Sequence, residues 1–405
     1  MRVLLLTQWF DPEPTFKGLA FARELQKQGF DVEVITGFPN YPGGKIYPGY
    51  KMSVFERKVI DGVTVTRVPL YASHDQRALR RVLNYVSFAA SATVAGLFFV
   101  KRPDVIYAYH PPLTVGLAAA IIRFFRRTPV VYDIQDMWPD TLRATGMLNN
   151  EKALSLVDSV CRFVYRSMDK IVVLSPGFRR LLLERGVPES KLEVIYNWCD
   201  ESSIGASNEQ SQAGAGYKMG QGFSVLFAGN MGRAQALDAV LQAAGIVAGS
   251  APDVRFDFLG GGVEVARLKQ LAIDTGLNNV AFHPAVPMAE VGKYLHDADA
   301  LLVHLKQDPL FKVTIPSKTQ AYMAAGRPII MAVDGDAADL IRESQCGYIA
   351  QSENPEAIAN AVLKMREMSL EDRESMAKKA RDYYRDNLSI FSGVRRFANV
   401  FRSVS

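Results

Sequence analysis

Short apolar runs alternate with amphipathic stretches along the first 200 residues. RVLLLTQ (2–8) is apolar, and residues 18–28 after it show helical periodicity. Further runs that predict strands are DVEVITG (31–37), MSVFERKVI (52–60), VTVTRVPLY (63–71), DVIYAYH (104–110), PVVYDIQ (129–135), KIVVLS (170–175) and LEVIYN (192–197). Strands that alternate with helices predict a parallel sheet with helices on both faces.

The pattern stops at DESSIGASNEQSQAGAGYKMGQG (200–222), which has almost no large apolar residue and predicts a linker. Strand-like runs then resume as FSVLFAGN (223–230), VRFDFLGGG (254–262), NVAFHP (279–284), ADALLVHL (298–305), RPIIMAV (327–333) and GYIA (347–350). We therefore predict an α/β chain with domains at 1–200 and 223–385, a linker at 201–222 and a C-terminal helix at 386–405. In such sheets ligands bind at the carboxyl ends of the strands.

Composition is that of an ordinary globular protein, with 405 residues, 48% of them hydrophobic and 22% charged. Charge is uneven, because the first 200 residues carry 26 Lys/Arg against 19 Asp/Glu, and the rest 21 against 23. This favours an acidic partner for the first half: a phosphate, an anionic membrane surface or nucleic acid. Cys161, Cys199 and Cys346 are too scattered to predict a disulfide or a metal site, as in a reducing cytoplasm. The first strand begins at once, so we expect no signal peptide.

One stretch, VLNYVSFAASATVAGLFFV (82–100), is nearly uncharged and long enough to span a bilayer. Arg80 and Arg81 precede it and Lys101 follows it, while polar residues such as Asn84 dilute it. Three interpretations stay open: a spanning helix, a buried domain helix, and a helix that lies on an anionic membrane surface.

Two glycine turns follow consecutive predicted strands of the second half. In FAGNMGRAQALDAVLQAA, Gly229 and Gly232 precede a helix predicted to begin near Ala234, with Arg233 beside it. FLGGGVEVARL places glycines at 260–262 in the equivalent position. Helix N-terminal amides hold anions, so the two turns together predict a phosphate-bearing ligand, although each alone could be a plain tight turn.

The stretch IPSKTQAYMAAGRPIIM (315–331) predicts a helix that begins near Pro316 and ends at Gly326. Lys318 in its first turn is unfavourable beside the positive end of the helix unless an anion shares the site. The alternative is a solvated lysine.

These motifs, with HPAVP and DADALLVHL between them, resemble the donor domain of family 4 retaining glycosyltransferases of the GT-B fold. LLLTQWFDPE, GFPNYPGG, YHPPLTVG and YDIQDMWPD are similar to the WbuB-type subfamily, which is associated with N-acetyl-L-fucosamine transfer in bacterial O-antigen and capsule synthesis. The resemblance implies two Rossmann-like, doubly wound domains that face a cleft, with the tail helix crossing back to the first domain.

The resemblance also implies a set of donor-binding residues: Gly229, Asn230, Arg233, Gly261, His283, Lys318 and Asp339. Glycine amides and the two cations would hold the diphosphate, and residues 282–284 would contact the base. Many family members have two acids where this chain has Val313 and Ala321, so the usual ribose ligand is missing. Asp339 and Glu343 are candidate replacements.

In the N-terminal half, family members often have His-Asp at the end of a cleft strand, where this chain has Gln135-Asp136. Asp136 is the candidate to orient or deprotonate the acceptor hydroxyl, or else a helix N-cap. Gln135 can hydrogen-bond a sugar hydroxyl but cannot act as an acid or base. His110 could face the cleft or pack beside its prolines.

Five further residues are candidates for the acceptor side or the cleft: Asp11, Glu13, Lys17, Gly18 and Trp138. Asp11 and Glu13 would point at the cleft mouth, and Lys17 and Gly18 would lie near the donor phosphate. The alternative for DPEP is a turn, and the alternative for Trp138 is a place in the core. Asp133 is interpreted as structural.

The implied substrate is a UDP-sugar, with no cofactor and no metal, because no Asp-x-Asp or His/Cys cluster is visible. Helix amides with Arg233 and Lys318 would stabilise the leaving diphosphate. The implied acceptor is a polyprenyl-diphosphate-linked saccharide, so the protein would be cytoplasmic and peripheral on the inner membrane, with no nucleic-acid partner.

Two alternatives share this fold: an enzyme of the UDP-N-acetylglucosamine 2-epimerase type, and a non-catalytic subunit that binds nucleotide sugars. An NAD-dependent dehydrogenase is disfavoured because QWFDPEPTFKG lacks the glycine pattern expected after the first strand.

Overall fold

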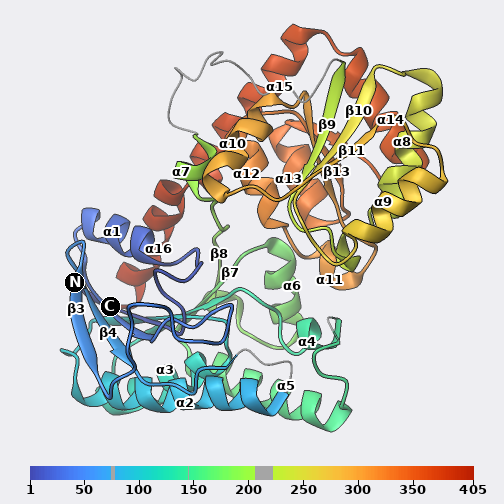
Figure 1. Cartoon of the computed structure of the whole chain (residues 1–405). Helices are drawn as coiled ribbons and strands as arrows, with labels where there is room; N and C mark the ends of the chain where they lie inside the picture. The colour runs from blue at the N-terminus through green and yellow to red at the C-terminus, as the bar shows by residue number, and fades with distance from the viewer. Residues whose placement is uncertain (74–77, 145, 206–221) are drawn as a thin grey trace. The chain divides into compact units, whose positions relative to one another are not determined.

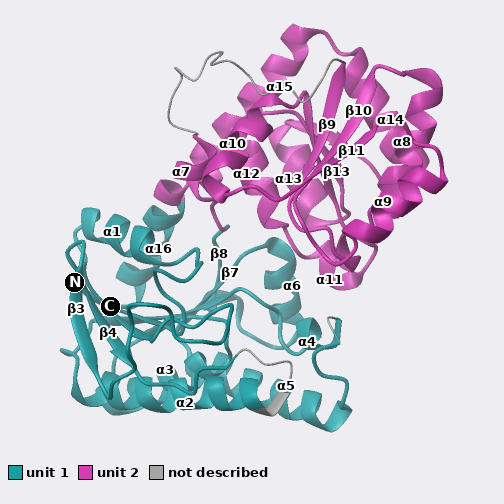
Figure 2. Cartoon of the chain, viewed as in Figure 1, with its two compact units in different colours: residues 1–196, 393–405 teal, residues 197–392 magenta. Residues whose placement is uncertain are grey.

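The computed structural model describes residues 1–73, 78–144, 146–205 and 222–405 (Figure 1). They form two compact units, with Met1–Tyr196 and Gly393–Ser405 in unit 1 and Asn197–Ser392 in unit 2 (Figure 2). Most of the predicted linker, at 206–221, lies outside the described residues.

Unit 1 is built on an eight-stranded sheet with the order β3-β4-β2-β1-β5-β6-β7-β8. Its strands are β1 (Arg2–Thr7), β2 (Asp31–Gly37), β3 (Glu56–Ile60), β4 (Val63–Val68), β5 (Val105–Tyr109), β6 (Val130–Ile134), β7 (Lys170–Val173) and β8 (Leu192–Val194). Its helices are α1 (Leu19–Lys27), α2 (Ala78–Phe98), α3 (Thr114–Arg126), α4 (Asp140–Ala144), α5 (Glu151–Ser167), α6 (Pro176–Glu184), the short η1 (Glu189–Lys191) and most of α16 (Ile390–Val404). Only the pair β3–β4 is antiparallel.

The central strands of unit 1 are covered on both faces, which is why they read as continuous apolar runs. All residues of β5 and β6 are buried. Helices α2, α3 and α5 cover one face of the sheet, and α1 and α16 cover the other (Figure 1). The strand order reverses between β1 and β5, so the loops after these strands lie at the switch point where ligands bind in such sheets. No helix among the described residues is both long and apolar enough to cross a membrane.

The C-terminal helix α16 packs on unit 1 through aromatic rings. The ring of Phe397 lies 5.3 Å from that of Phe21 and 5.5 Å from that of Tyr107, and Phe401 lies 5.8 Å from Tyr107. These edge contacts bury the end of the chain against α1 and the central strand β5.

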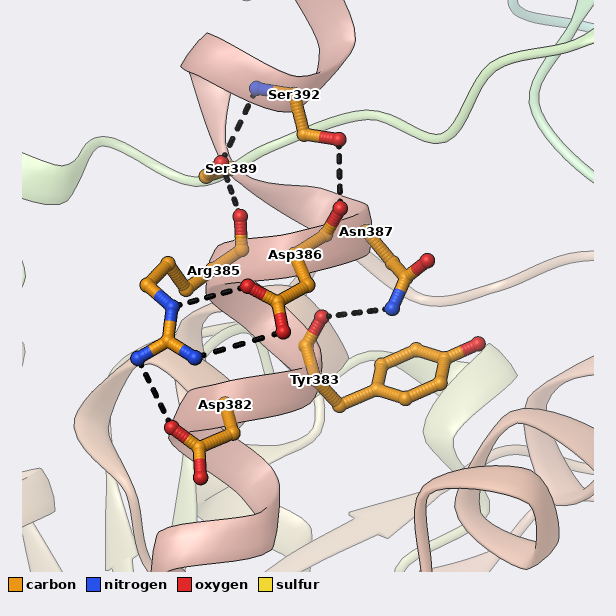
Figure 3. Close-up of polar contacts among 7 residues, drawn as sticks. All are labelled: Asp382, Tyr383, Arg385, Asp386, Asn387, Ser389 and Ser392. Atoms are coloured by element: carbon orange, nitrogen blue, oxygen red, sulfur yellow. Dashed lines mark hydrogen bonds and ion pairs between the residues drawn. The ribbon is translucent and has the colours of Figure 1, made fainter.

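A π-helical turn, η3 (Tyr384–Leu388), precedes α16 and is fixed by its own side chains (Figure 3). Arg385 forms ion pairs with Asp382 at 3.0 Å and Asp386 at 2.9 Å. The Ser392 hydroxyl donates to the Asp386 carbonyl at 2.8 Å, which ties the first turn of α16 to the turn before it.

Unit 2 is built on a six-stranded parallel sheet with the order β11-β10-β9-β12-β13-β14. Its strands are β9 (Phe223–Ala228), β10 (Val254–Leu259), β11 (Val280–His283), β12 (Ala300–His304), β13 (Ile329–Ala332) and β14 (Gly347–Ile349). Its helices are α7 (Glu201–Ile204), η2 (Arg233–Gln235), α8 (Asp238–Ser250), α9 (Val265–Asp274), α10 (Met288–Asp297), α11 (Pro309–Lys312), α12 (Ser317–Ala325), α13 (Asp336–Ser344), α14 (Pro355–Glu367), α15 (Leu370–Tyr383) and η3.

The predicted fold class, with two parallel-sheet Rossmann-like units, is confirmed. One boundary is wrong: the helix after β9 begins at Asp238 and not near Ala234. The short helix η2 and Ala236, in the left-handed region with φ of 43°, lie between the strand and the helix. Gly326 ends α12 in the left-handed region with φ of 64°, as a glycine C-cap does.

Candidate functional site

The two glycine turns of unit 2 lie directly against each other. Gly229, Gly260 and Gly262 have φ of 135°, 140° and 145°, which side chains rarely tolerate. A Cβ on Gly260 would lie 2.1 Å from the Gly229 carbonyl oxygen, and one on Gly262 would lie 2.3 Å from that of Met231. Glycine is therefore required here because backbone packs on backbone.

Backbone hydrogen bonds join the carboxyl ends of three neighbouring strands. The Met231 amide donates to the Gly261 carbonyl at 2.7 Å, and the Glu264 amide donates to the Met231 carbonyl at 3.1 Å. The Gly260 amide donates to the His283 carbonyl at 3.1 Å. The turns after β9 and β10 thus form one rigid backbone surface at this edge of the sheet.

Lys318, in the first turn of α12, points its ammonium group at this surface. Its Nζ lies 3.6 Å from the centre of the Phe227 ring and would lie 3.3 Å from a Cβ on Gly229. Nζ is buried, and among the described residues nothing accepts a hydrogen bond from it. Burial lowers the pKa of Lys318 to about 7. A buried amine that lacks a hydrogen-bond acceptor among the described residues, beside glycine amides, is an arrangement that an anion would complete.

Tyr322 fixes the position of Lys318, because it lies one turn further along α12. Its buried hydroxyl accepts from the Ala228 amide at 2.8 Å and donates to the Ala228 carbonyl at 3.1 Å. This bridge ties α12 to the last residue of β9, immediately before Gly229. Sequence reasoning missed it, since the two residues are 94 positions apart.

His304, at the end of β12, forms a second contact between distant segments that could not be predicted from the sequence. Its Nδ1 lies 2.6 Å from the Gln235 carbonyl, and its Nε2 lies 3.1 Å from the Glu353 amide nitrogen. A carbonyl only accepts and an amide only donates, so the ring is neutral with its proton on Nδ1. Burial lowers the pKa of His304, in agreement with this state. The ring therefore anchors η2, the turn that carries Arg233.

The Arg233 side chain is 91% exposed, and its Nε lies 3.6 Å from a Glu264 oxygen. Glu264 is also paired with Arg267 at 2.6 Å, and Arg267 binds Asp238 at the same distance. Arg233 is thus the loosely held member of this network and is accessible at the glycine turns.

The remaining donor candidates lie in different surroundings. His283 Nε2 is held 2.7 Å from the buried Asp257 carboxylate, so its ring is anchored in the sheet. Asn230 is exposed at the first glycine turn. Asp339 is exposed on α13 and forms an ion pair with Arg342. Neither Asp339 nor His283 is shown in contact with Lys318, and their donor roles stay predictions.

In unit 1, Asp136 follows β6 and is half-buried. Its carboxylate has no hydrogen-bond or ion-pair partner in the part of the chain that the structure describes. Burial alone raises the pKa of Asp136 above the ordinary value for aspartate. A carboxylate with a raised pKa and an unoccupied hydrogen-bonding capacity is suited to take a proton from a bound hydroxyl.

Asp133, by contrast, is a buried structural carboxylate, as predicted. It accepts hydrogen bonds from the Tyr107 hydroxyl and the Gln135 side-chain amide, both at 2.6 Å. Lys17 is also buried and is electrostatically coupled to Asp133; burial lowers the pKa of Lys17 to about 8. The sequence interpretation has Lys17 near the donor phosphate, whereas in unit 1 its side chain is buried, with Nζ 5.9 Å from the centre of the Phe21 ring.

Asp11 and Glu13 also serve the local fold, in agreement with the turn interpretation of DPEP. Asp11 Oδ2 accepts from the Leu19 amide at 2.6 Å at the start of α1, and a Cβ on Gly18 would lie 2.1 Å from this oxygen. Glu13 is buried, and its Oε1 accepts from the amides of Asn40 at 2.7 Å and Tyr41 at 2.8 Å. Their carboxylates are therefore occupied by backbone amides.

His110 and Trp138 pack edge to face, with ring centres 5.4 Å apart at an angle of 82°. Burial lowers the pKa of His110 to about 3, so the imidazole is neutral at physiological pH. His110 Nδ1 and Trp138 Nε1 are both buried with no hydrogen-bond partner in the described chain. This is the packed histidine that the sequence left as an alternative, and its catalytic role stays a prediction.

Two family models match the chain in succession. Residues 19–198 match the "Glycosyl transferase 4-like domain", and residues 216–383 match "Glycosyl transferases group 1". Together with the two Rossmann-like units, these matches define the class: the chain is a glycosyltransferase of the GT-B fold, with a family 4-like domain followed by a group 1 domain.

Two relatives that the chain is similar to are named as glycosyltransferases. It is 26% identical to WcaI of Escherichia coli K12, named for colanic acid biosynthesis, over 99% of this chain and 100% of that protein. It is 25% identical to WbjE of Pseudomonas aeruginosa, named as a glycosyltransferase, over 82% of each chain. The crystal structure of Anabaena HepE in complex with UDP and glucose shares the fold with a TM-score of 0.68, at 16% identity and full coverage of both chains.

Among the described residues, no group of three or more His, Cys, Asp or Glu is arranged to hold a metal ion. The metal-free reaction implied by the resemblance stays a prediction.

Proposed function

We propose that the chain transfers a sugar from a UDP-sugar to a lipid-linked saccharide, with retention of anomeric configuration. The observation that carries this proposal is the buried Lys318 Nζ, which has no hydrogen-bond acceptor among the described residues and lies beside the Gly229 turn of unit 2. The presence of UDP in the HepE structure supports a uridine nucleotide as the ligand. The name of WcaI supports polysaccharide synthesis as the setting.

Lys318 and the amides of the Gly229 turn would neutralise the negative charge that develops on the diphosphate as its bond to the anomeric carbon breaks. Arg233 is free enough to close on the same charge. Asp136 would orient the acceptor hydroxyl and receive its proton as the new glycosidic bond forms.

The proposed donor sugar is an N-acetylated 6-deoxyhexosamine such as N-acetyl-L-fucosamine, and the proposed acceptor is a polyprenyl-diphosphate-linked saccharide. Both follow from the similarity of the N-terminal motifs to the WbuB-type subfamily. Such an acceptor requires that the protein work in the cytoplasm, at the surface of the inner membrane. The basic excess in the first 200 residues supports this location.

Isothermal titration without metal tests the donor site with UDP, GDP and UDP-N-acetylglucosamine. It compares the wild type, Lys318→Ala and the control Lys364→Ala, which changes an exposed lysine on α14. We expect UDP to bind and only Lys318→Ala to weaken it. Turnover of UDP-N-acetyl-L-fucosamine with a lipid-linked acceptor then separates an enzyme from a binding subunit. A folded protein that binds no nucleotide would refute the donor site.

A further inference from the structure

Helix α2 is apolar on the side that faces solvent as well as on the side that faces the sheet. Its exposed positions repeat every four residues, as one stripe of a helix does: Val82, Val86, Ala90, Val94 and Phe98. Val86 is 50% exposed and Phe98 is 74% exposed. The opposite stripe, with Phe88 and Ala92, is fully buried. A helix that only packs on a soluble domain has a polar outer stripe, so this outer face needs another explanation.

Helix α3 extends the same apolar surface beside α2 (Figure 1). Its outer side exposes Ile121, Phe124 and Phe125, and the two phenylalanines are 75% and 68% exposed. The helices are in close contact, because a Cβ on Gly96 of α2 would lie 2.4 Å from the Ile122 side chain.

The carboxyl ends of α2 and α3 are fastened to each other. Arg126 donates to the carbonyls of Leu97 and, at 3.1 Å, Val100. The neighbouring Phe99 is exposed and contacts Phe55 with ring centres 5.2 Å apart. We define the docking face as the outer residues of the two helices, namely Val82, Val86, Val94, Phe98, Phe99, Ile121, Phe124 and Phe125.

The charged residues of the two helices and of their immediate flanks are all basic. Residues 78–103 and 111–132, which include both helices and their flanks, contain seven Lys/Arg and no Asp/Glu. Lys101, Arg102 and Arg127 are exposed at the ends of the helices, next to the phenylalanines. Aromatic and aliphatic side chains bordered by cations match the apolar interior and the anionic headgroups of a lipid surface.

A second copy of the chain fits this face less well. A symmetric dimer would bring the same face of two molecules together, and with it two sets of the exposed, like-charged side chains of Lys101, Arg102 and Arg127. We therefore propose that the docking face lies on an anionic phospholipid bilayer, with α2 parallel to the surface over a length of about 30 Å. This deepens the proposed function and rests on it for its purpose, since a lipid-linked acceptor is presented at such a surface.

Flotation with large unilamellar vesicles tests the proposal, using phosphatidylcholine alone and with about 30% phosphatidylglycerol. The full chain is compared with the variant Phe98→Ser/Phe124→Ser/Phe125→Ser and with Lys101→Glu/Arg102→Glu/Arg127→Glu. Phe391→Ser, which changes an exposed phenylalanine of unit 2, is the matched control. Thermal unfolding and UDP titration of each variant report folding and the donor site separately from lipid binding.

We expect the wild type and the control to float with anionic vesicles, and both triple variants to lose at least tenfold in partition. The charge-reversed variant should also lose the salt dependence of binding. The proposal is overturned if the wild type does not float, or if the serine variant floats as well as the wild type. It is equally overturned if sedimentation shows that the wild type is a dimer and that, of the two triple variants, only the serine variant is a monomer. Lipid binding without UDP binding would instead refute the donor site alone.

Discussion

Replacement of Lys318 by Met should stabilise the empty protein and weaken its affinity for UDP. Burial lowers the pKa of Lys318 from 10.5 to about 7 in the folded state. The unfolded chain therefore keeps a proton that the folded chain releases between these values, so stability rises with pH by about 1.4 kcal/mol per unit across this window. Below pH 7 both states are protonated and the penalty is constant. At pH 7.5 removal of the amine should thus raise the free energy of unfolding by up to about 4 kcal/mol.

Bound diphosphate favours the charged form of Lys318, because it supplies the anion that the ammonium group lacks in the empty site. With a pKa of about 7, most empty sites hold a neutral amine at pH 8. UDP binding should then take up nearly one proton per site at pH 8, and only about a tenth of a proton at pH 6. Loss of the charge-assisted hydrogen bond should cost about 1.5–3 kcal/mol, or roughly 10- to 150-fold in Kd.

Titration calorimetry in two buffers of different ionisation enthalpy measures the proton uptake directly. Wild type and Lys318→Met are compared at both pH values, so that protons exchanged by UDP itself cancel in the difference. Lys364→Met serves as a control, since Lys364 is exposed on α14. Scanning calorimetry from pH 6 to 10 gives the stability of the empty proteins, including whether the two units unfold separately.

Two outcomes would refute the reasoning about Lys318. One is a proton uptake at pH 8 that is the same in wild type and Lys318→Met, which would mean that UDP binding does not change the protonation of the lysine. The other is a Lys318→Met variant with lower stability than the wild type at neutral pH, which would mean that the ammonium group has a structural partner.

Three further predictions concern other residues. Asp136→Asn should lower turnover about 10²- to 10⁴-fold with unchanged UDP affinity, and wild-type activity should fall as the pH drops through the raised pKa of Asp136; a rate within threefold of the wild type would contradict this. Gly260→Ala should abolish UDP binding, since its Cβ would overlap the Gly229 carbonyl, whereas Gly249→Ala on α8, whose Cβ meets nothing within 4 Å, should retain it; equal titration curves would disprove the backbone surface. Glu13→Ala should destabilise unit 1 by at least about 2 kcal/mol in urea, because two backbone amides lose their acceptor.

Much of the fold could be predicted, because the buried parallel strands of both units are short apolar runs and the alternation of strands with helices is regular. The glycine turns could be predicted too, since Gly229 and Gly260 follow apolar runs directly. The cation at Lys318 stood out because a lysine is unfavourable in the first turn of a helix. Each of these signals is local in the sequence.

The contacts of several candidate side chains could not be predicted, because they depend on distant partners. Nothing near Asp11 shows that its carboxylate accepts from the Leu19 amide, and nothing near Lys17 shows that it will be buried beside Asp133. The Tyr322 bridge and the His304 contact join residues separated by 94 and 69 positions. A single sequence carries no signal for such pairs. A charged residue after a strand is therefore interpreted as a ligand-binding residue even where it stabilises the fold.

The division of the chain into two units has a consequence for how such proteins diversify. Every predicted donor residue belongs to unit 2, and every predicted acceptor or catalytic residue belongs to unit 1. The polypeptide passes from one unit to the other only after Tyr196 and after Ser392. Genetic recombination at these two points would join the donor half of one ancestor to the acceptor half of another, with each buried core inherited whole. New combinations of donor and acceptor specificity can therefore arise by recombination of the two halves, without changes within either half.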